Sequence, residues 1–167
     1  MPKILLKLIN ISTVWALLLS LLLVNNTQAM SVPETKLQQT LAEHRGQVVY
    51  LDFWASWCGP CRKSFPWMND MQQKYRDQGF VIISVNLDAD KTLATEFLLE
   101  NPANFLVIYD PEGDIAQQFN IQGMPSSLLI DKQGNVQKAH TGFFTKKVKL
   151  YETQLMALLA VKERVDL

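Results

Sequence analysis

Two cysteines separated by two residues are the part of this chain best suited to chemistry. They form the segment Cys58-Gly59-Pro60-Cys61, which follows an apolar run and precedes a sequence with helical periodicity. A cysteine at the start of a helix faces unpaired backbone N–H groups and the positive end of the helix dipole, and both favour the thiolate over the thiol. Gly59 allows a tight bend, and Pro60 suits the first helical position. This spacing predicts a redox-active disulfide in which Cys58 is the nucleophile and Cys61, one turn further into the helix, displaces the captured substrate.

Two other uses of the cysteine pair are less favourable. A purely structural disulfide would close a loop of only about four residues, which stabilises a fold by roughly 2 kcal/mol, less than a long loop would gain. A metal site would need two more ligands, and the two histidines, His44 and His140, lie far from each other and from the cysteines in the sequence. We therefore expect neither a metal ion nor a cofactor.

Helices and strands alternate along the chain and place the cysteine pair at a strand-to-helix junction. The run VVYLDFW before the cysteines is apolar and rich in β-branched and aromatic residues, as expected of a buried strand. We predict helices over residues 31–45, 60–78, 92–100, 114–119 and 146–161, and strands over 48–54, 80–87, 105–109, 127–130 and 136–141, the last two forming a hairpin. This alternation predicts an α/β fold with antiparallel strands near its end.

The composition is that of one globular domain. The chain has 167 residues, of which 48% are hydrophobic and 19% charged, so it can build a core and is not expected to be disordered as a whole. Sixteen lysines and arginines balance sixteen aspartates and glutamates, so the chain lacks the basic surface expected of a nucleic-acid-binding protein. Two cysteines are too few for a disulfide-dense scaffold.

The first 29 residues have the order of features of a secretory signal peptide. Two lysines precede an apolar stretch over residues 8–24, and Thr27-Gln28-Ala29 offers a cleavage site after Ala29. An uncleaved membrane anchor is the alternative, because the apolar stretch reaches the lower length limit for a spanning helix. We predict a leader over residues 1–29, a domain over residues 30–167 and a periplasmic location, with attachment to the inner membrane if the leader is retained.

A resemblance to a known family rests on the segment around the cysteines. Asp52-Phe53-Trp54-Ala55-Ser56-Trp57-Cys58-Gly59-Pro60-Cys61 resembles the active-site segment of thioredoxins. The leader, together with an additional helix and strand between Leu87 and Asp110, is similar to the TlpA-like branch of the thioredoxin superfamily. The resemblance covers residues 48–159 and implies a thioredoxin-like fold, in which a central mixed β-sheet lies between helices in three layers, with a helix-strand insertion. It also implies an exported thiol-disulfide oxidoreductase that acts on disulfides or dithiols of proteins.

Asp52 corresponds in this resemblance to the buried carboxylate beneath the active site of thioredoxins. An acid within an apolar run is costly to bury, and desolvation is expected to raise its pKa. A carboxylate with a raised pKa can take the proton from Cys61 when that thiol must attack. The resemblance therefore implies that Asp52 is catalytic together with Cys58 and Cys61.

The resemblance also implies a substrate-binding surface around the cysteines. Trp57 corresponds to the aromatic residue that packs over the cysteines and contacts partners, and Gly59 and Pro60 lie between the two sulfurs in the sequence. Pro125 corresponds to a cis proline that faces the disulfide, and cis bonds are almost confined to X-Pro. The residue before it, Met124, is expected to offer its backbone to an extended substrate peptide.

Three positions bear on how closely the chain follows the family pattern. TlpA-like proteins of cytochrome c maturation usually carry a glutamate three residues after the second cysteine, where this chain has Ser64, which argues against that specialised role. Most TlpA-like proteins replace the buried aspartate by asparagine, whereas Asp52 is retained here. The lysine that thioredoxins pair with this aspartate is missing from Ser84-Val85-Asn86, so Asp52 is expected to be more strongly desolvated than usual.

The Gly-Pro dipeptide between the cysteines resembles that of reducing thioredoxins, which implies a protein that reduces disulfides in proteins of the cell envelope. In an oxidising periplasm, a monomeric reductase of this kind requires a membrane electron donor of the DsbD type. The same chemistry in reverse would make the protein a dithiol oxidase, and the reduction potential distinguishes the two directions. A thiol peroxidase and a Cu(I)-binding metallochaperone, in which Cys58 and Cys61 would bind copper, are further alternatives.

Overall fold

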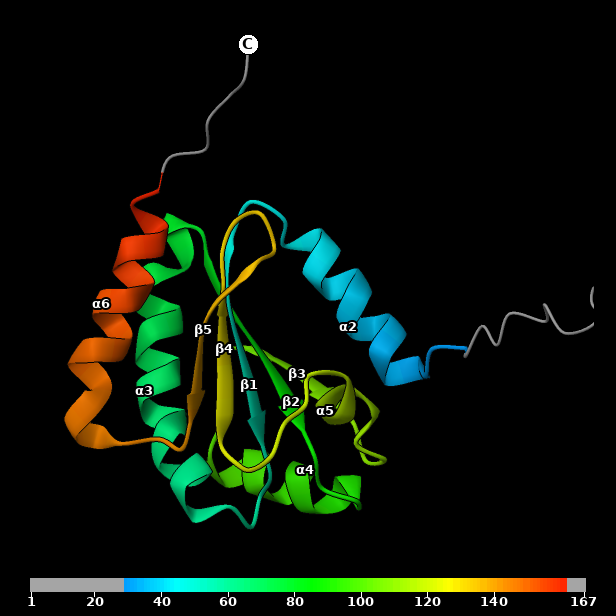
Figure 1. Ribbon diagram of the computed structural model, residues 1–167. Coiled ribbons are helices and arrows are strands. Elements are labelled where there is room, and N and C mark those ends of the chain that lie inside the picture. Colours follow the sequence, from blue (N-terminus) through cyan, green and yellow to red (C-terminus); the bar gives the residue numbers. More distant parts are fainter. Residues whose placement is uncertain (1–28, 162–167) are drawn as a thin grey trace, which may run out of the picture. The chain divides into compact units, whose positions relative to one another are not determined.

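The computed structural model describes residues 29–161, in which helices and strands alternate (Figure 1). The helices are α2 (Val32–Glu43), α3 (Gly59–Tyr75), α4 (Lys91–Glu100), α5 (Asp114–Gln118) and α6 (Val148–Leu159), and the strands are β1 (Val48–Trp54), β2 (Phe80–Asn86), β3 (Leu106–Tyr109), β4 (Ser126–Ile130) and β5 (Val136–Thr141). Only Ala29 of the expected leader falls within this range, so the prediction of a signal peptide or anchor lies outside the described residues. No helix within residues 29–161 is long and apolar enough to cross a membrane.

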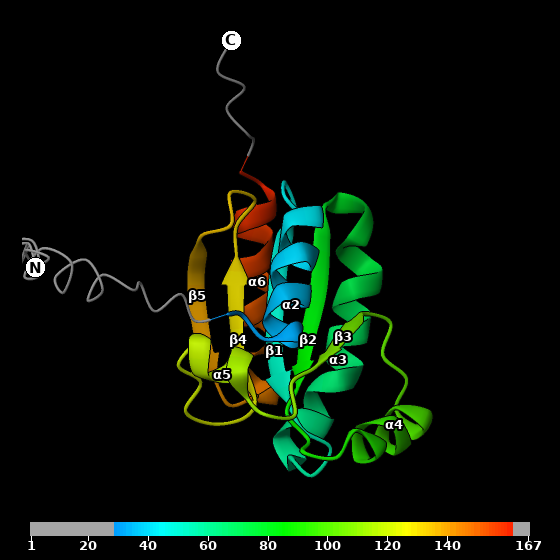
Figure 2. The ribbon, with the colours of Figure 1, turned by 90° about the vertical axis from the view of Figure 1, so that its right-hand side faces the viewer.

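Five strands form one mixed sheet in the order β3-β2-β1-β4-β5. Strand β2 is parallel to both β1 and β3, whereas β4 is antiparallel to both β1 and β5. Helices α3 and α6 cover one face of the sheet, and α2 and α5 cover the other (Figure 1, Figure 2). The predicted three-layer fold with a central mixed sheet is confirmed, and α4 and β3 form the expected insertion.

The alternation of side chains along β1 divides the core into two parts. Tyr50 and Trp54 point to the face covered by α3 and α6, where they join a cluster of buried residues that includes both cysteines. Leu51 and Phe53 point to the opposite face and pack with residues of α2 and α5. Asp52 alternates with Leu51 and Phe53 along the strand, so it lies on the same face as the cysteines.

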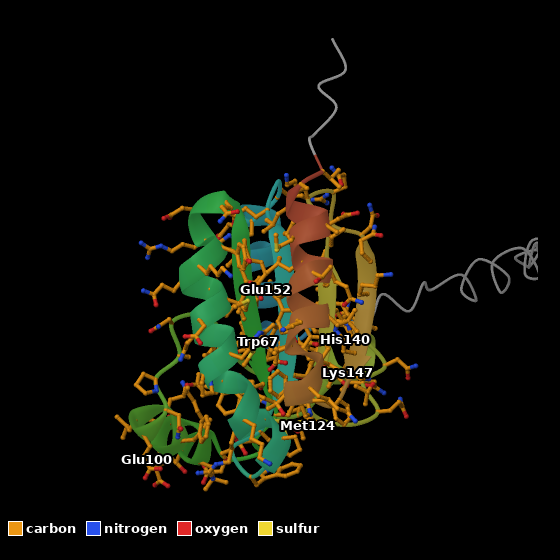
Figure 3. All side chains as sticks on the ribbon, turned by 90° about the vertical axis from the view of Figure 1, so that its left-hand side faces the viewer. Trp67, Glu100, Met124, His140, Lys147 and Glu152 are labelled. Carbon is orange, nitrogen blue, oxygen red and sulfur yellow. A yellow bond between two sulfur atoms is a disulfide. The ribbon has the colours of Figure 1, made fainter. Side chains whose placement is uncertain are left out.

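Helix α3, which begins directly after Cys58, is fixed at both of its ends. Near its start, the ring of Phe65 packs edge-on against Trp54 of β1 and Phe97 of α4, with ring centroids 4.8 Å and 4.9 Å away. Near its end, the Glu152 carboxylate of α6 accepts a hydrogen bond from Lys74 Nζ at 2.5 Å (Figure 3 labels Glu152). These contacts hold the first turn of α3 in a defined position relative to the sheet.

The observed elements differ from those predicted from the sequence by at most three residues at their ends. The largest difference is at the end of α3, where the last turn is a 3₁₀ helix, Arg76–Gln78. Pro66 lies inside α3, and the helix continues past it to Tyr75. Helix α6 turns Tyr151 and Leu155 into the core.

The two edges of the sheet are short or irregular. Strand β3 has only four residues. Strand β5 is largely exposed and carries Lys138, and a register shift between Leu129 and Ile130 interrupts its pairing with β4. Neither edge therefore presents a long flat row of unpaired backbone groups.

Candidate active site

The cysteine pair lies at the start of α3, as the sequence predicts. Cys58 and Cys61 are joined by a disulfide bond. Cys58 has extended backbone geometry and is the N-cap residue of α3, and its Sγ accepts a hydrogen bond from the Cys61 N–H at 3.3 Å. A sulfur in this position satisfies one of the backbone N–H groups that a helix start leaves unpaired, and negative charge on it is favoured by the helix dipole.

Cys58 is the more exposed of the two cysteines, but only slightly. It is 5% exposed and Cys61 is completely buried, so Cys58 is the cysteine closer to solvent. In this oxidised form the Cys58 sulfur is bonded to a residue of the core, which draws it into the apolar cluster. The Trp57 side chain, which the resemblance expects to contact partners, is 66% exposed, so most of the indole is free for such a contact.

Asp52 is buried without a cationic partner. It is 1% exposed, and its Oδ2 makes no hydrogen bond with any described residue. Ser84 is opposite it on β2, but the Ser84 hydroxyl is engaged by the Trp54 indole N–H and by the carbonyl of Leu106. Burial therefore raises the pKa of Asp52 well above its usual range, in agreement with the prediction. The pKa of Tyr50, two residues earlier on the same face, is also raised. Burial is the main cause, and the charge of Asp52 is the second.

The loop before β4 brings Met124 to the end of the molecule where α3 begins (Figure 3). The Met124–Pro125 peptide bond is cis, as the family resemblance implies. Met124 packs against the cluster that contains both cysteines, and Pro125 is buried. The position of Pro125 is fixed by a backbone hydrogen bond, because its carbonyl accepts from the Gly142 N–H at 2.7 Å. Among the described residues, neither the N–H nor the carbonyl of Met124 has a hydrogen-bond partner.

Ser64 occupies the position at which TlpA-like proteins of cytochrome c maturation carry a glutamate. Its side chain is buried, and its hydroxyl donates to the carbonyl oxygen of Cys61 at 2.8 Å. The hydroxyl is thus satisfied within the helix, and this position presents no acid to the cysteines.

Asp88 is a residue of this region that sequence reasoning missed. It is buried just beyond the end of β2, where its carboxylate accepts hydrogen bonds from the Ser56 N–H at 3.0 Å, the Ser56 hydroxyl at 2.9 Å and the Asn86 side-chain amide at 2.8 Å. It therefore ties the end of β2 to the loop that leads into Cys58. The sequence does contain a signal for this contact, namely an acid directly after a buried strand. Neighbouring parallel strands bring the loops that follow them together, so such an acid can reach the loop after the next strand.

Replacing Asp88 by alanine is expected to lower the free energy of unfolding by about 2 to 4 kcal/mol, since it leaves the half-buried Ser56 N–H and the buried Asn86 amide without an acceptor. Asp90→Ala is the matched control, because Asp90 is an exposed N-cap that accepts from the Thr92 N–H at 2.9 Å. Loss of such a cap costs about 1 kcal/mol. Urea unfolding of both variants measures the difference. Equal losses in the free energy of unfolding would mean that the hydrogen bonds of Asp88 contribute no more than an exposed helix cap.

The described histidines and acids do not gather into a metal site. Within residues 29–161, no group of three His, Cys, Asp or Glu side chains is arranged to hold a metal ion. His44 Nδ1 lies 2.6 Å from Gln47 Oε1, and His140 Nε2 lies 2.8 Å from Gln154 Oε1. Each histidine is therefore paired with a glutamine rather than with the cysteines.

Comparison with known proteins places this site in a family. The Redoxin family model matches residues 25–155. The thiol-disulfide oxidoreductase ResA of Geobacillus kaustophilus is 33% identical over 110 residues, which are 66% of this chain and 63% of that protein. ResA of Bacillus subtilis is 32% identical over 108 residues, which are 65% of this chain and 60% of that protein. The chain thus matches less than two thirds of the length of these relatives.

Solved structures show the same fold. A crystal structure from Chlorobium tepidum, described as a thiol:disulfide interchange protein DsbE, is 50% identical with a TM-score of 0.71 and covers 72% of this chain and 85% of that chain. StoA from Bacillus subtilis is 26% identical with a TM-score of 0.57 and covers 66% of this chain and 84% of that chain. The fold, the cysteine pair at the start of α3 and the family match over most of the sequence agree, and the chain belongs to the Redoxin family.

Proposed function

We propose that this protein is an exported thiol-disulfide oxidoreductase that reduces disulfides in proteins of the cell envelope. The observation that carries the proposal is the Cys58–Cys61 disulfide at the first turn of α3, with the buried Asp52 on the same face of the sheet. The names of the ResA and DsbE relatives support the same reaction class.

The reaction proceeds by two thiol-disulfide exchanges. In the reduced protein, the Cys58 thiolate attacks one sulfur of the substrate disulfide, which forms a mixed disulfide and releases the other substrate sulfur as a thiolate. The Cys61 thiol then loses its proton to Asp52, and its sulfur attacks Cys58 Sγ. The mixed disulfide breaks, the second substrate sulfur leaves, and the Cys58–Cys61 bond forms. Two electrons pass from the cysteine pair to the substrate.

Each exchange is assisted by a feature of the structure. The Cys61 N–H, which donates to Cys58 Sγ, and the start of α3 stabilise the thiolate of Cys58 as attacking and leaving group. The raised pKa of Asp52 makes this carboxylate a stronger base than an exposed aspartate, so it can accept the proton from Cys61.

The substrate is held mainly through its backbone. The free N–H and carbonyl of Met124 pair with an extended substrate segment beside the cis Pro125. The exposed indole of Trp57 contacts the segment from the other side, and Gly59 and Pro60 leave room for its approach to Cys58 because no side chain crowds Gly59. This mode of binding suits protein substrates of varied sequence.

The cellular setting follows from the leader and from the direction of the reaction. We propose that residues 1–29 export the protein to the periplasm as a monomer and that they are either cleaved after Ala29 or retained as an inner-membrane anchor. A reductase in this oxidising compartment depends on a membrane electron donor of the DsbD type to reopen the Cys58–Cys61 bond. Labelling of the reduced cysteines by a thiol reagent that passes the outer membrane but not the inner membrane, in intact cells, tests this location, and labelling only after lysis would exclude it.

The reduction potential decides between reductase and oxidase. We expect equilibration with glutathione or dithiothreitol to give a value near about −270 mV, the potential of thioredoxin. Reductases with such potentials reduce substrate disulfides and are themselves reoxidised by them. A value near about −120 mV, the potential of a strong oxidant, would reverse the proposed direction.

A further inference from the structure

A groove lies directly beside the cysteine pair, between the active-site loop, the first turn of α3 and helix α4. It has a volume of about 280 Å³ and is lined by Trp57, Arg62, Leu93, Glu96, Phe97 and Glu100. Ser56, which Asp88 holds in place, is also part of its wall. The groove is formed by the insertion, because four of its lining residues belong to α4.

Part of the groove wall is apolar. Leu93 is 45% exposed, and the largely exposed indole of Trp57 lies on the loop side of the groove. Phe97 is buried at its base, and the Arg62 guanidinium lies over the Phe97 ring, 5.3 Å from its centroid. Two large exposed apolar side chains beside a reactive sulfur gain free energy if a partner covers them.

The groove also carries two acids, Glu96 and Glu100, against one cation, Arg62. Glu96 and Glu100 lie one turn apart on the exposed side of α4, and neither forms a salt bridge with any described residue. Figure 3 labels Glu100 on α4, at the end of the molecule that also holds Met124 and the start of α3. Two acids spaced in this way repel each other, and negative charge in the last turn of a helix opposes the helix dipole. A cation supplied by a partner relieves both effects.

We propose that this groove binds the segment of the substrate protein next to the reacting cysteine, and that it favours a large apolar residue followed by lysine or arginine. The proposal rests on the proposed function. The proposal is based on the position of the groove: Ser56 and Trp57 line it and also belong to the loop that leads into Cys58. A substrate whose sulfur reaches Cys58 must therefore lie along this loop. The apolar side chain covers Trp57 and Leu93, and the basic side chain reaches Glu96 and Glu100.

Two matched peptides test the proposal. Each forms a disulfide with a neutral thiol through a single cysteine, and the cysteine is followed by leucine and then by either lysine or glutamate. The wild-type protein is expected to reduce the lysine peptide with a kcat/KM roughly threefold to fivefold higher than that of the glutamate peptide, the size of effect typical of exposed charge pairs. Glu96→Gln with Glu100→Gln is expected to bring this ratio close to one, and Glu96→Lys with Glu100→Lys to invert it.

The ratio of two peptides in one variant cancels any general effect of the substitutions on the cysteines. Glu43→Lys is the matched control, because Glu43 is an exposed glutamate at the end of α2 and is expected to leave the ratio unchanged. Equal kcat/KM values for the two peptides in the wild type, or a ratio that the Glu96 and Glu100 variants do not alter, would overturn the proposal.

A binding measurement separates this proposal from the proposed function. S-methylated forms of the same peptides cannot react, so their titration into the oxidised protein reports binding alone. We expect the lysine peptide to shift the NMR signal of the Trp57 indole N–H at lower concentration than the glutamate peptide does. Failure of the protein to reduce any disulfide would refute the proposed function, whereas the absence of this preference in the titration would refute the groove.

Discussion

Cys58→Ser is expected to lower the rate of disulfide reduction by about a thousandfold or more, since it removes the nucleophile of the first exchange. Serine has nearly the same shape and keeps the N-cap of α3, so the fold is expected to persist. The rate is measured with hydroxyethyl disulfide, a small neutral substrate whose reduction requires no contact with the groove.

Cys61→Ser provides the matched comparison for this result. Its Cys58 still attacks, but no second thiol displaces the substrate, so the protein is expected to accumulate as a covalent adduct that mass spectrometry detects. An adduct on Cys61 in the Cys58→Ser variant, formed as fast as that on Cys58 in the Cys61→Ser variant, would reverse the assigned order of the two cysteines.

Asp52→Asn is expected to slow the second exchange roughly a hundredfold at neutral pH, the lower range of what a positioned general base contributes. The first exchange is expected to change little, because Cys58 obtains its thiolate from the start of α3 rather than from Asp52. Stopped-flow measurement of Trp fluorescence with a substrate whose mixed disulfide accumulates before Cys61 breaks it separates the two steps. Equal slowing of both steps would refute the role of Asp52 as the base for Cys61.

The same substitution is expected to stabilise the fold at neutral pH. An aspartate in the unfolded chain has a pKa near about 3.9, whereas burial raises the pKa of Asp52 in the folded protein. Between these two values the folded state binds more protons than the unfolded state, so the free energy of unfolding falls as the pH rises. Asparagine carries no charge at any pH, so Asp52→Asn is expected to be more resistant to urea than the wild type at pH 7. The difference is expected to disappear below about pH 4.

The elements of the fold were predictable because each has a strong local signal. The run from Val48 to Trp54 is too apolar for anything but a buried strand, and the hairpin of β4 and β5 turns at Gly134, whose φ of 88° favours glycine. The cysteine pair was equally clear, since its position after a strand and before a helix can be read from the sequence alone. The cis bond before Pro125 came from the family resemblance, and no local signal specifies it.

The parts that escaped prediction depend on which segments are neighbours in space. Asp88 reaches Ser56 only because β2 lies beside β1, and the sequence does not state the order of strands in the sheet. The slight exposure of Cys58 and the high exposure of Trp57 depend in the same way on how the loop is packed. The groove escaped prediction as well, because its two sides come from α4 and from the loop before α3.

The form of the sheet edges has a consequence for how the protein meets unfolded chains. On the proposed function, the protein handles polypeptides that are not yet folded, and such chains add readily to any long open strand and build aggregates from it. The four residues of β3 and the interrupted register beside β5 offer a poor template for such growth. On the proposed function, backbone pairing with an incoming polypeptide is then expected to be confined to Met124, and a pairing this short does not retain the product.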